Sequence, residues 1–246
     1  MNDLIWIVAL VFLIAGTVKG TVGIGLPTAS ISLLSQFYDP HKSVALVIIP
    51  MILSNVWQIY RAGEVVRTIT AYWRFALVLM GFMWVFSNIS ATIPDHLFLI
   101  CLGSVVVLFS LTSLFLHPPA LPDRFDRIGQ VICGSLAGMM GGLTGIWSPP
   151  MVGYFVARRL GKEDFVRASG LLVFLGSLPL GLGYWQNGLM TETVALTSLA
   201  MFIPTIIGFS LGEVIRRHVD ADRFQKVVLT VFLLMGLNII RKAFLV

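Results

Sequence analysis

Charged residues are scarce in this sequence: Asp, Glu, Lys and Arg make up 12% of its 246 residues, whereas a soluble domain carries about a quarter. The mean hydropathy is +0.90. Apolar runs near the ~20 residues needed to cross a bilayer recur from end to end and leave no stretch for a soluble domain. The sequence therefore predicts an all-α integral membrane protein whose residues 1–246 form a single membrane domain.

Cysteine is nearly absent as well. Cys101 and Cys133 lie inside apolar runs without metal-ligand spacing, so we expect neither a disulfide nor a metal site. The start, Met1-Asn2-Asp3, lacks the basic region of a cleaved signal peptide, so the first apolar run is expected to stay in the mature protein. There is no P-loop, which argues against ATP-driven pumping by this chain alone. No cofactor is predicted.

Acids and bases suited to catalysis are missing from the apolar runs. Gly208-Phe209-Ser210-Leu211-Gly212 matches the G-x-S-x-G pattern of serine hydrolases, but that pattern needs a strand-turn-helix setting and a partner histidine. Ser210 lies in an apolar run, and the histidines lie in loops or at the ends of runs: His41, His96, His117 and His218. We predict no catalytic residue and keep an intramembrane enzyme as the least favoured alternative.

The formal charge of +5 and the pI of about 9.5 do not indicate nucleic-acid binding, because the basic residues lie in short loops between apolar segments. Positive loops are typical of the cytoplasmic side of membrane proteins. The expected partners are therefore the lipid bilayer and a small substrate, with no nucleic acid. The sequence leaves the oligomeric state open, a homo-oligomer included.

Eight apolar segments are present, and two of them are too long for one crossing. They cover approximately residues 4–37, 43–60, 72–92, 97–116, 128–160, 166–185, 191–215 and 224–245. The first and fifth would each be roughly 50 Å long as straight helices, against a hydrocarbon core of ~30 Å. Glycine and proline interrupt both, at Lys19 to Pro27 and at Gly141 to Pro150, and end helices at this density.

Each broken segment either crosses the membrane once or enters and returns as a re-entrant helical hairpin. If both crossed, nine loop Lys/Arg would lie on one side and seven on the other. If both are hairpins, thirteen share one side, and Lys42, Arg241 and Lys242 lie opposite. The positive-inside rule favours hairpins. It predicts a multi-pass protein of the cytoplasmic (inner) membrane with both termini extracytoplasmic.

The two breaks resemble each other at an offset of 122 residues, with six identities in thirteen positions from Ala15 to Pro27. We interpret this as an internal duplication, with repeat 1 at about 1–121 and repeat 2 at about 122–246. A hairpin plus three spans is an odd number of crossings, so the repeats are expected to be inverted. The proline-rich stretch His117 to Asp123 is predicted to be the extended cytoplasmic linker between them.

The breaks are also where a substrate is expected. Non-helical backbone within a bilayer persists only inside protein or beside a water-filled cavity. The helices restarting near Pro27 and Pro149 would present free N–H groups, which attract anions. The predicted substrate-binding residues are Lys19, Gly20, Thr21, Gly23, Gly25, Pro27, Gly142, Thr144, Gly145, Trp147, Ser148 and Pro149.

Each side-chain role has a structural alternative. Lys19 is either an anchor for the anion or a side chain that extends to an interface or bonds backbone carbonyls. The hydroxyls of Thr21, Thr28, Ser30, Thr144 and Ser148 either bind the anion or bond back to their own helix. Trp147 either lines the pathway or packs. Asn55, Gln58 and Asn88 either face the pathway or form interhelical hydrogen bonds.

The duplicated layout, with Gly20 to Pro27 and Gly142 to Pro149 opening each half and Trp185-Gln186-Asn187-Gly188 after the sixth segment, resembles the sulfite exporter TauE/SafE family. The resemblance covers essentially the whole chain. It implies transport of sulfite, sulfonates or other small organic anions across the cytoplasmic membrane, often outward. The chain departs from the family's G-G-G run at both breaks, with Gly23-Ile24-Gly25-Leu26 and Gly145-Ile146-Trp147-Ser148.

The predicted function is therefore a secondary transporter, expected to be an exporter, for a small anion such as sulfite or an organosulfonate. Alternating access between the inverted repeats would move it. An anion channel shares the same sequence features except coupling and remains the main alternative.

Overall fold

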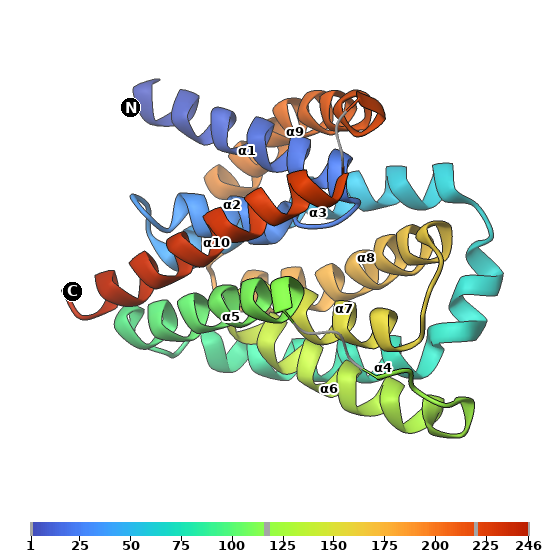
Figure 1. Ribbon diagram of the computed structural model, residues 1–246. Coiled ribbons are helices and arrows are strands. Elements are labelled where there is room, and N and C mark those ends of the chain that lie inside the picture. The colour runs from blue at the N-terminus through green and yellow to red at the C-terminus, as the bar shows by residue number, and fades with distance from the viewer. Residues whose placement is uncertain (1, 116–118, 219–220, 246) are drawn as a thin grey trace.

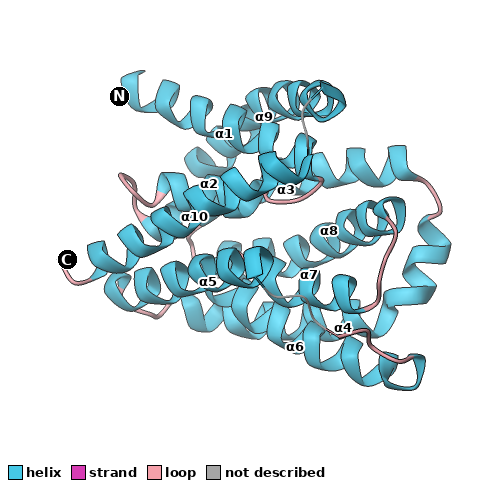
Figure 2. Cartoon of the chain, in the orientation of Figure 1, coloured by secondary structure: helices cyan, strands magenta, loops and turns pink. Residues whose placement is uncertain are grey.

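The computed structural model describes residues 2–115, 119–218 and 221–245, and these fold entirely into helices and loops (Figure 2). The first five helices are α1 (Asn2–Val22), α2 (Leu26–Leu34), α3 (Pro40–Ala62), α4 (Val65–Ser90) and α5 (Asp95–Phe115). A 3-10 turn, η1 (Asp123–Phe125), leads into α6 (Asp126–Thr144), α7 (Ser148–Ala157), α8 (Lys162–Gln186), α9 (Glu192–His218) and α10 (Ala221–Ala243). The all-helical prediction is confirmed.

Seven helices in the described part of the chain are long and apolar enough to cross a membrane. They cover Ile5–Val22, Pro40–Ala62, Val65–Ser90, Asp95–Phe115, Lys162–Gln186, Glu192–Arg216 and Arg223–Ala243. The two long apolar segments each divide into a longer and a shorter helix, α1 with α2 and α6 with α7. The shorter members have nine and ten residues, too few to span the ~30 Å core.

Glycine backbone conformations produce both breaks. Gly23 and Gly145, which are 122 residues apart, have φ of +89° and +75°, and Gly25 has φ of +104°. Side chains with a Cβ rarely adopt these values, and glycine does so freely. A proline then occupies the first turn of α2 and of α7, where its missing N–H has no helical partner to lose.

Helix α7 folds back alongside α6. Arg158, just after α7, places its Nε 3.0 Å from Oδ1 of Asp126, the first residue of α6. Tyr154 donates its hydroxyl to the same carboxylate at 2.6 Å, and the Leu121 N–H donates to the Ala157 carbonyl at 2.8 Å. The end of α7 therefore lies beside the start of α6.

Helix α2 ends beside the C-terminal part of α10. Lys242 donates its Nζ to the Ser35 carbonyl at 3.0 Å, and Asn238 donates to the Gln36 side chain. In Figure 1 both chain ends lie on the left together with the α2–α3 connection, whereas the α3–α4 and α7–α8 connections lie on the right. The two short helices thus run from the centre of the molecule toward opposite ends.

Helix pairs are arranged in a reciprocal pattern. Helix α1 packs along α9 as α6 packs along α4, α3 contacts α9 as α8 contacts α4, and α5 packs against α10. Glycine allows close approach where α1 crosses α9 and where α6 crosses α4: a Cβ on Gly16 would lie 2.3 Å from the Thr205 carbonyl oxygen, and one on Gly138 would lie 2.7 Å from that of Leu79. The glycine pairs Gly16 with Gly20 and Gly138 with Gly142 therefore serve helix packing.

Paired basic residues lie near the α3–α4 and α7–α8 connections, which are at the right in Figure 1. Arg61 at the end of α3 pairs with Glu213 in α9 at 2.7 Å, and Arg167 in α8 lies 3.4 Å from Glu64 before α4. In the proposed linker, His117 and Pro118 lie outside the described residues, and Asp123 begins the 3-10 turn rather than continuing an extended chain. Asp123 there accepts a hydrogen bond that raises the pKa of Arg158.

Candidate functional site

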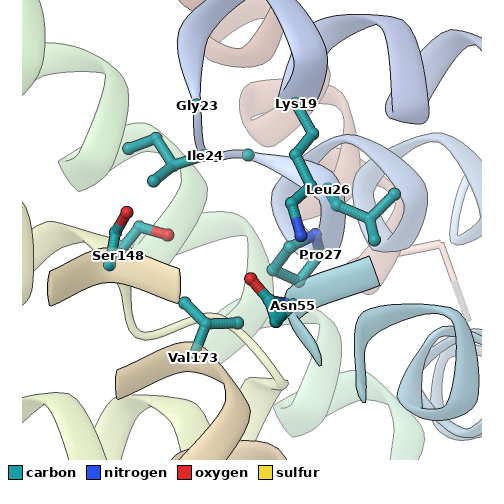
Figure 3. A pocket seen from close by; sticks show the side chains of 10 residues that line it. Lys19, Gly23, Ile24, Leu26, Pro27, Asn55, Ser148 and Val173 are labelled. Carbon is teal, nitrogen blue, oxygen red and sulfur yellow. The ribbon is translucent and has the colours of Figure 1, made fainter. Parts of the chain in front are cut away.

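A small pocket lies where the two breaks meet at the centre of the helices (Figure 3). The first broken segment contributes Lys19 from α1, the connection through Gly23, Ile24 and Gly25, and the start of α2. Further lining residues come from three other helices: Asn55 of α3, Ser148 of α7, and Ser169 and Val173 of α8. Both predicted repeats therefore contribute to one site.

Lys19 supplies the charge of this pocket. Its side chain is 2% exposed, and its Nζ donates a hydrogen bond to the Ser54 hydroxyl at 2.9 Å. The Phe209 ring lies below the ammonium, 5.9 Å from Nζ to the ring centroid. Among the side chains that the structure describes, no carboxylate lies within 4.0 Å of this ammonium. Figure 3 shows the nitrogen pointing toward Asn55 and Pro27.

The N-terminal ends of α2 and α7 reach the same pocket. Leu26 and Pro27 in the first turn of α2 line it, as does Ser148, the first residue of α7. The residues preceding these helices, Gly25 and Trp147, provide no side-chain cap to either end. Uncapped N–H groups carry the positive end of a helix dipole. The pocket thus combines the Lys19 amino group with two helix N-termini, an arrangement that favours an anion.

The pocket is closed in this conformation. Its volume of about 10 Å³ is roughly the room needed by one water molecule. Ile24, Leu26 and Val173 provide apolar walls beside the polar groups. An anion of several heavy atoms therefore requires the elements around the pocket to separate.

Five of the predicted site residues line the pocket: Lys19, Gly23, Gly25, Pro27 and Ser148. Among the others, Thr21 donates to the carbonyls of Thr17 and Gly212, and Thr144 donates to that of Met140. In this conformation the two hydroxyls are therefore engaged by backbone carbonyls, which is the structural alternative to binding an anion. Gly20, Gly142, Gly145, Trp147 and Pro149 also lie outside the lining.

Two of these residues serve the site indirectly. Trp147 is 1% exposed, and its ring packs so closely on α6 and α8 that a Cβ on Gly141 would lie 2.8 Å from it and one on Gly176 3.3 Å. It supports the turn before α7. Gly145 provides that turn's left-handed backbone conformation.

Sequence reasoning left Ser54, Ser169 and Val173 out of the site. These serines sit in apolar runs like many others in the chain, so their positions carried no distinguishing signal. Asn55, which the sequence offers either for the pathway or for an interhelical hydrogen bond, lies in the pocket lining. Gln58 donates instead to the Val166 carbonyl at 2.8 Å.

The alternative of serine catalysis finds no support at Ser210. This residue lies within α9, and its hydroxyl donates to the Ile206 carbonyl at 2.9 Å. The strand-turn-helix setting of a nucleophile elbow is absent around it. Both cysteines have free thiols, and the described residues hold no cluster of three or more metal-ligating side chains.

Comparison with known proteins identifies one matching family. Residues 8–239 match the model of the family described as Sulfite exporter TauE/SafE. No curated protein and no solved structure matches the chain. The match covers nearly the whole chain and supports a multi-pass membrane protein of a transporter family. The chain belongs to the sulfite exporter TauE/SafE family.

Proposed function

We propose that the protein is a secondary transporter that exports a small anion, most simply sulfite or an organosulfonate, through the pocket between its two breaks. The observation that carries this proposal is the position of Lys19. Its ammonium is buried, has a hydroxyl rather than a carboxylate as partner, and shares its pocket with the starts of α2 and α7. A charge buried in apolar surroundings is costly, ~2.5 to 3.5 kcal/mol on insertion scales, and an anionic ligand would offset that cost.

The topology that we propose has α1 with α2, and α6 with α7, as re-entrant hairpins of opposite orientation. The contacts of Arg158 and Tyr154 with Asp126 support the second hairpin, and the Lys242 bond to Ser35 supports the first. The reciprocal helix pairing supports inverted repeats over about 1–121 and 122–246. In this topology both termini are extracytoplasmic and the basic end around Arg61 and Arg167 is cytoplasmic.

Transport then follows from alternating separation of the two repeats around the pocket. Lys19 attracts the anion, while the free N–H groups of the two short helices and the hydroxyl of Ser148 are available to its oxygens. The closed pocket is the occluded stage between the two access states. A membrane potential, an ion gradient or the substrate's own gradient provides the energy.

Flux of radiolabelled sulfite and of a labelled sulfonate in proteoliposomes tests this proposal. We expect saturable flux that is accelerated by unlabelled substrate on the opposite side, because counterflow requires a carrier. Lys19→Met vesicles should show strongly reduced flux, and Lys42→Met, which changes a lysine in the first turn of α3, should not. Unsaturable flux would instead indicate a channel. Absence of flux of any tested anion with the wild-type protein would contradict the proposal.

A further inference from the structure

Helix α2 and Ser35, the residue that ends it, carry four buried hydroxyl groups with no hydrogen-bond partner among the atoms that the structure describes. They belong to Thr28, Ser30, Ser32 and Ser35, each 0% exposed. In other helices of the described chain, the buried hydroxyls of Ser110 and Thr205 donate to the carbonyl four residues earlier. This local bond is the usual solution for serine and threonine in an apolar helix, so its absence along α2 needs an explanation.

Three of the four hydroxyls share one side of the helix. At about 100° per residue, Thr28, Ser32 and Ser35 lie within about 60° of one another, and Ser30 lies roughly opposite. Ile31 borders the same side, and its Cδ1 would lie 2.8 Å from a Cβ built on Gly145. The side of α2 with Thr28, Ser32 and Ser35, which we call the hydroxyl face, therefore has the second break near one of its edges, at Ile31.

The hydroxyl face connects two charged positions. It starts one residue after Pro27, which lines the pocket with Lys19, and ends at Ser35, whose carbonyl accepts the Lys242 ammonium at 3.0 Å. Helix α7 offers no counterpart: its Ser148 lies in the pocket, and the Tyr154 hydroxyl is engaged by Asp126. The hydroxyl face is therefore a feature of α2 and not of short helices in general.

We propose that Thr28, Ser32 and Ser35 line the extracytoplasmic half of the anion pathway, between the Lys19 pocket and Lys242. When α2 separates from the second hairpin, the three hydroxyls donate in turn to the oxygens of the passing anion or to its water. In the closed conformation they lose these partners, which explains why they are buried and unpaired. The inference rests on the proposed transport function and topology.

Cysteine scanning tests this inference. Thr28→Cys, Ser32→Cys and Ser35→Cys are made one at a time in a Cys101→Ser, Cys133→Ser background, because cysteine is close in size to both residues. An anionic, membrane-impermeant methanethiosulfonate reagent is added to either side of proteoliposomes of known orientation during flux, and modification is followed by protein mass. The matched control is Ser30→Cys, which is equally buried and unpaired but on the opposite side of α2.

We expect modification from the extracytoplasmic side at all three positions, at least tenfold faster than at Ser30→Cys and fastest at position 35. Saturating sulfite should slow it. Equal rates at position 30, no modification at the three positions, or modification from the cytoplasmic side alone would each overturn the inference. Protein mass reports labelling whether or not flux occurs, so this outcome can be separated from the transport proposal. If the parent protein transports the anion but the three introduced cysteines stay unmodified, the pathway is refuted and the transport proposal stands.

Discussion

The Lys19 ammonium donates a 2.9 Å hydrogen bond to the Ser54 hydroxyl, and both side chains are buried. This contact joins α1 to α3 at the edge of the pocket. A neutral hydroxyl satisfies one of the three N–H groups of the ammonium and leaves its charge uncompensated. The pair is therefore suited to hold the ammonium in place until an anion arrives.

Replacing Lys19 with methionine should weaken substrate binding without loosening the fold. A hydrogen bond to a charged group contributes about 1.5–3 kcal/mol, so the apparent affinity for sulfite should fall about 10- to 100-fold. Because the variant no longer buries a charge, its melting temperature in detergent should be equal or higher. Concentration-dependent flux and a thermal melt check the two effects. A large drop in melting temperature would assign Lys19 a structural role instead.

Replacing Ser54 with alanine should destabilise the protein by about 1–3 kcal/mol, because the ammonium loses its hydroxyl partner. The matched control is Ser110→Ala, which removes a buried hydroxyl that bonds to its own helix. Thermal melts of Ser54→Ala in the wild-type and Lys19→Met backgrounds form a double-mutant cycle. The cost should nearly vanish in the Lys19→Met background, and equal costs in both would show that the two side chains are not coupled.

Gly145→Ala should disrupt the second break. The position has φ of +75°, which costs a residue with a Cβ roughly 1–2 kcal/mol, and the new methyl group would lie 2.8 Å from Ile31 and Val44. Gly153→Ala is the control, since nothing lies within 4 Å of that position in α7 and alanine favours a helix by about 1 kcal/mol. Melting temperature and flux should fall for Gly145→Ala and not for Gly153→Ala. Similar melting temperatures for the two variants would contradict the claim that the turn at Gly145 requires glycine.

The hairpin topology predicts the side from which single cysteines react. Lys42→Cys, at the start of α3, should react with an impermeant maleimide added outside, and Lys162→Cys, at the start of α8, with reagent added inside. The background is again Cys101→Ser, Cys133→Ser. If both broken segments crossed the membrane, the two positions would share one side. Labelling of both from the cytoplasm would therefore overturn the hairpins.

The sequence predicted the positions of the breaks well because the cause is local. Gly23 and Gly145 permit the left-handed backbone of the breaks, and Pro27 and Pro149 fix their own φ, whatever surrounds them. The helices restart within one residue of those prolines. Side-chain roles depend on neighbours far away in the sequence. Ser54 is 35 residues from Lys19, and periodicity gave no reason to prefer it over other serines.

Thr21 illustrates the same limit. The sequence places its hydroxyl at the break, where it could bind the anion or bond back to its helix, and in the structure it donates to the Thr17 and Gly212 carbonyls. The pairing of α1 with α9 depends on a fit between glycines in two halves of the chain. Composition predicts close packing of this kind without saying which helices are partners.

Locating a bound anion tests the central claim most directly. Selenite is a close analogue of sulfite, and its selenium gives an anomalous signal in crystals of the wild-type protein soaked with it. We predict a peak in the pocket about 3–4 Å from Lys19 Nζ, a distance set by a charge-assisted hydrogen bond, and its loss in Lys19→Met crystals. A peak elsewhere, or none at concentrations that support flux, would contradict an anion site between the two breaks.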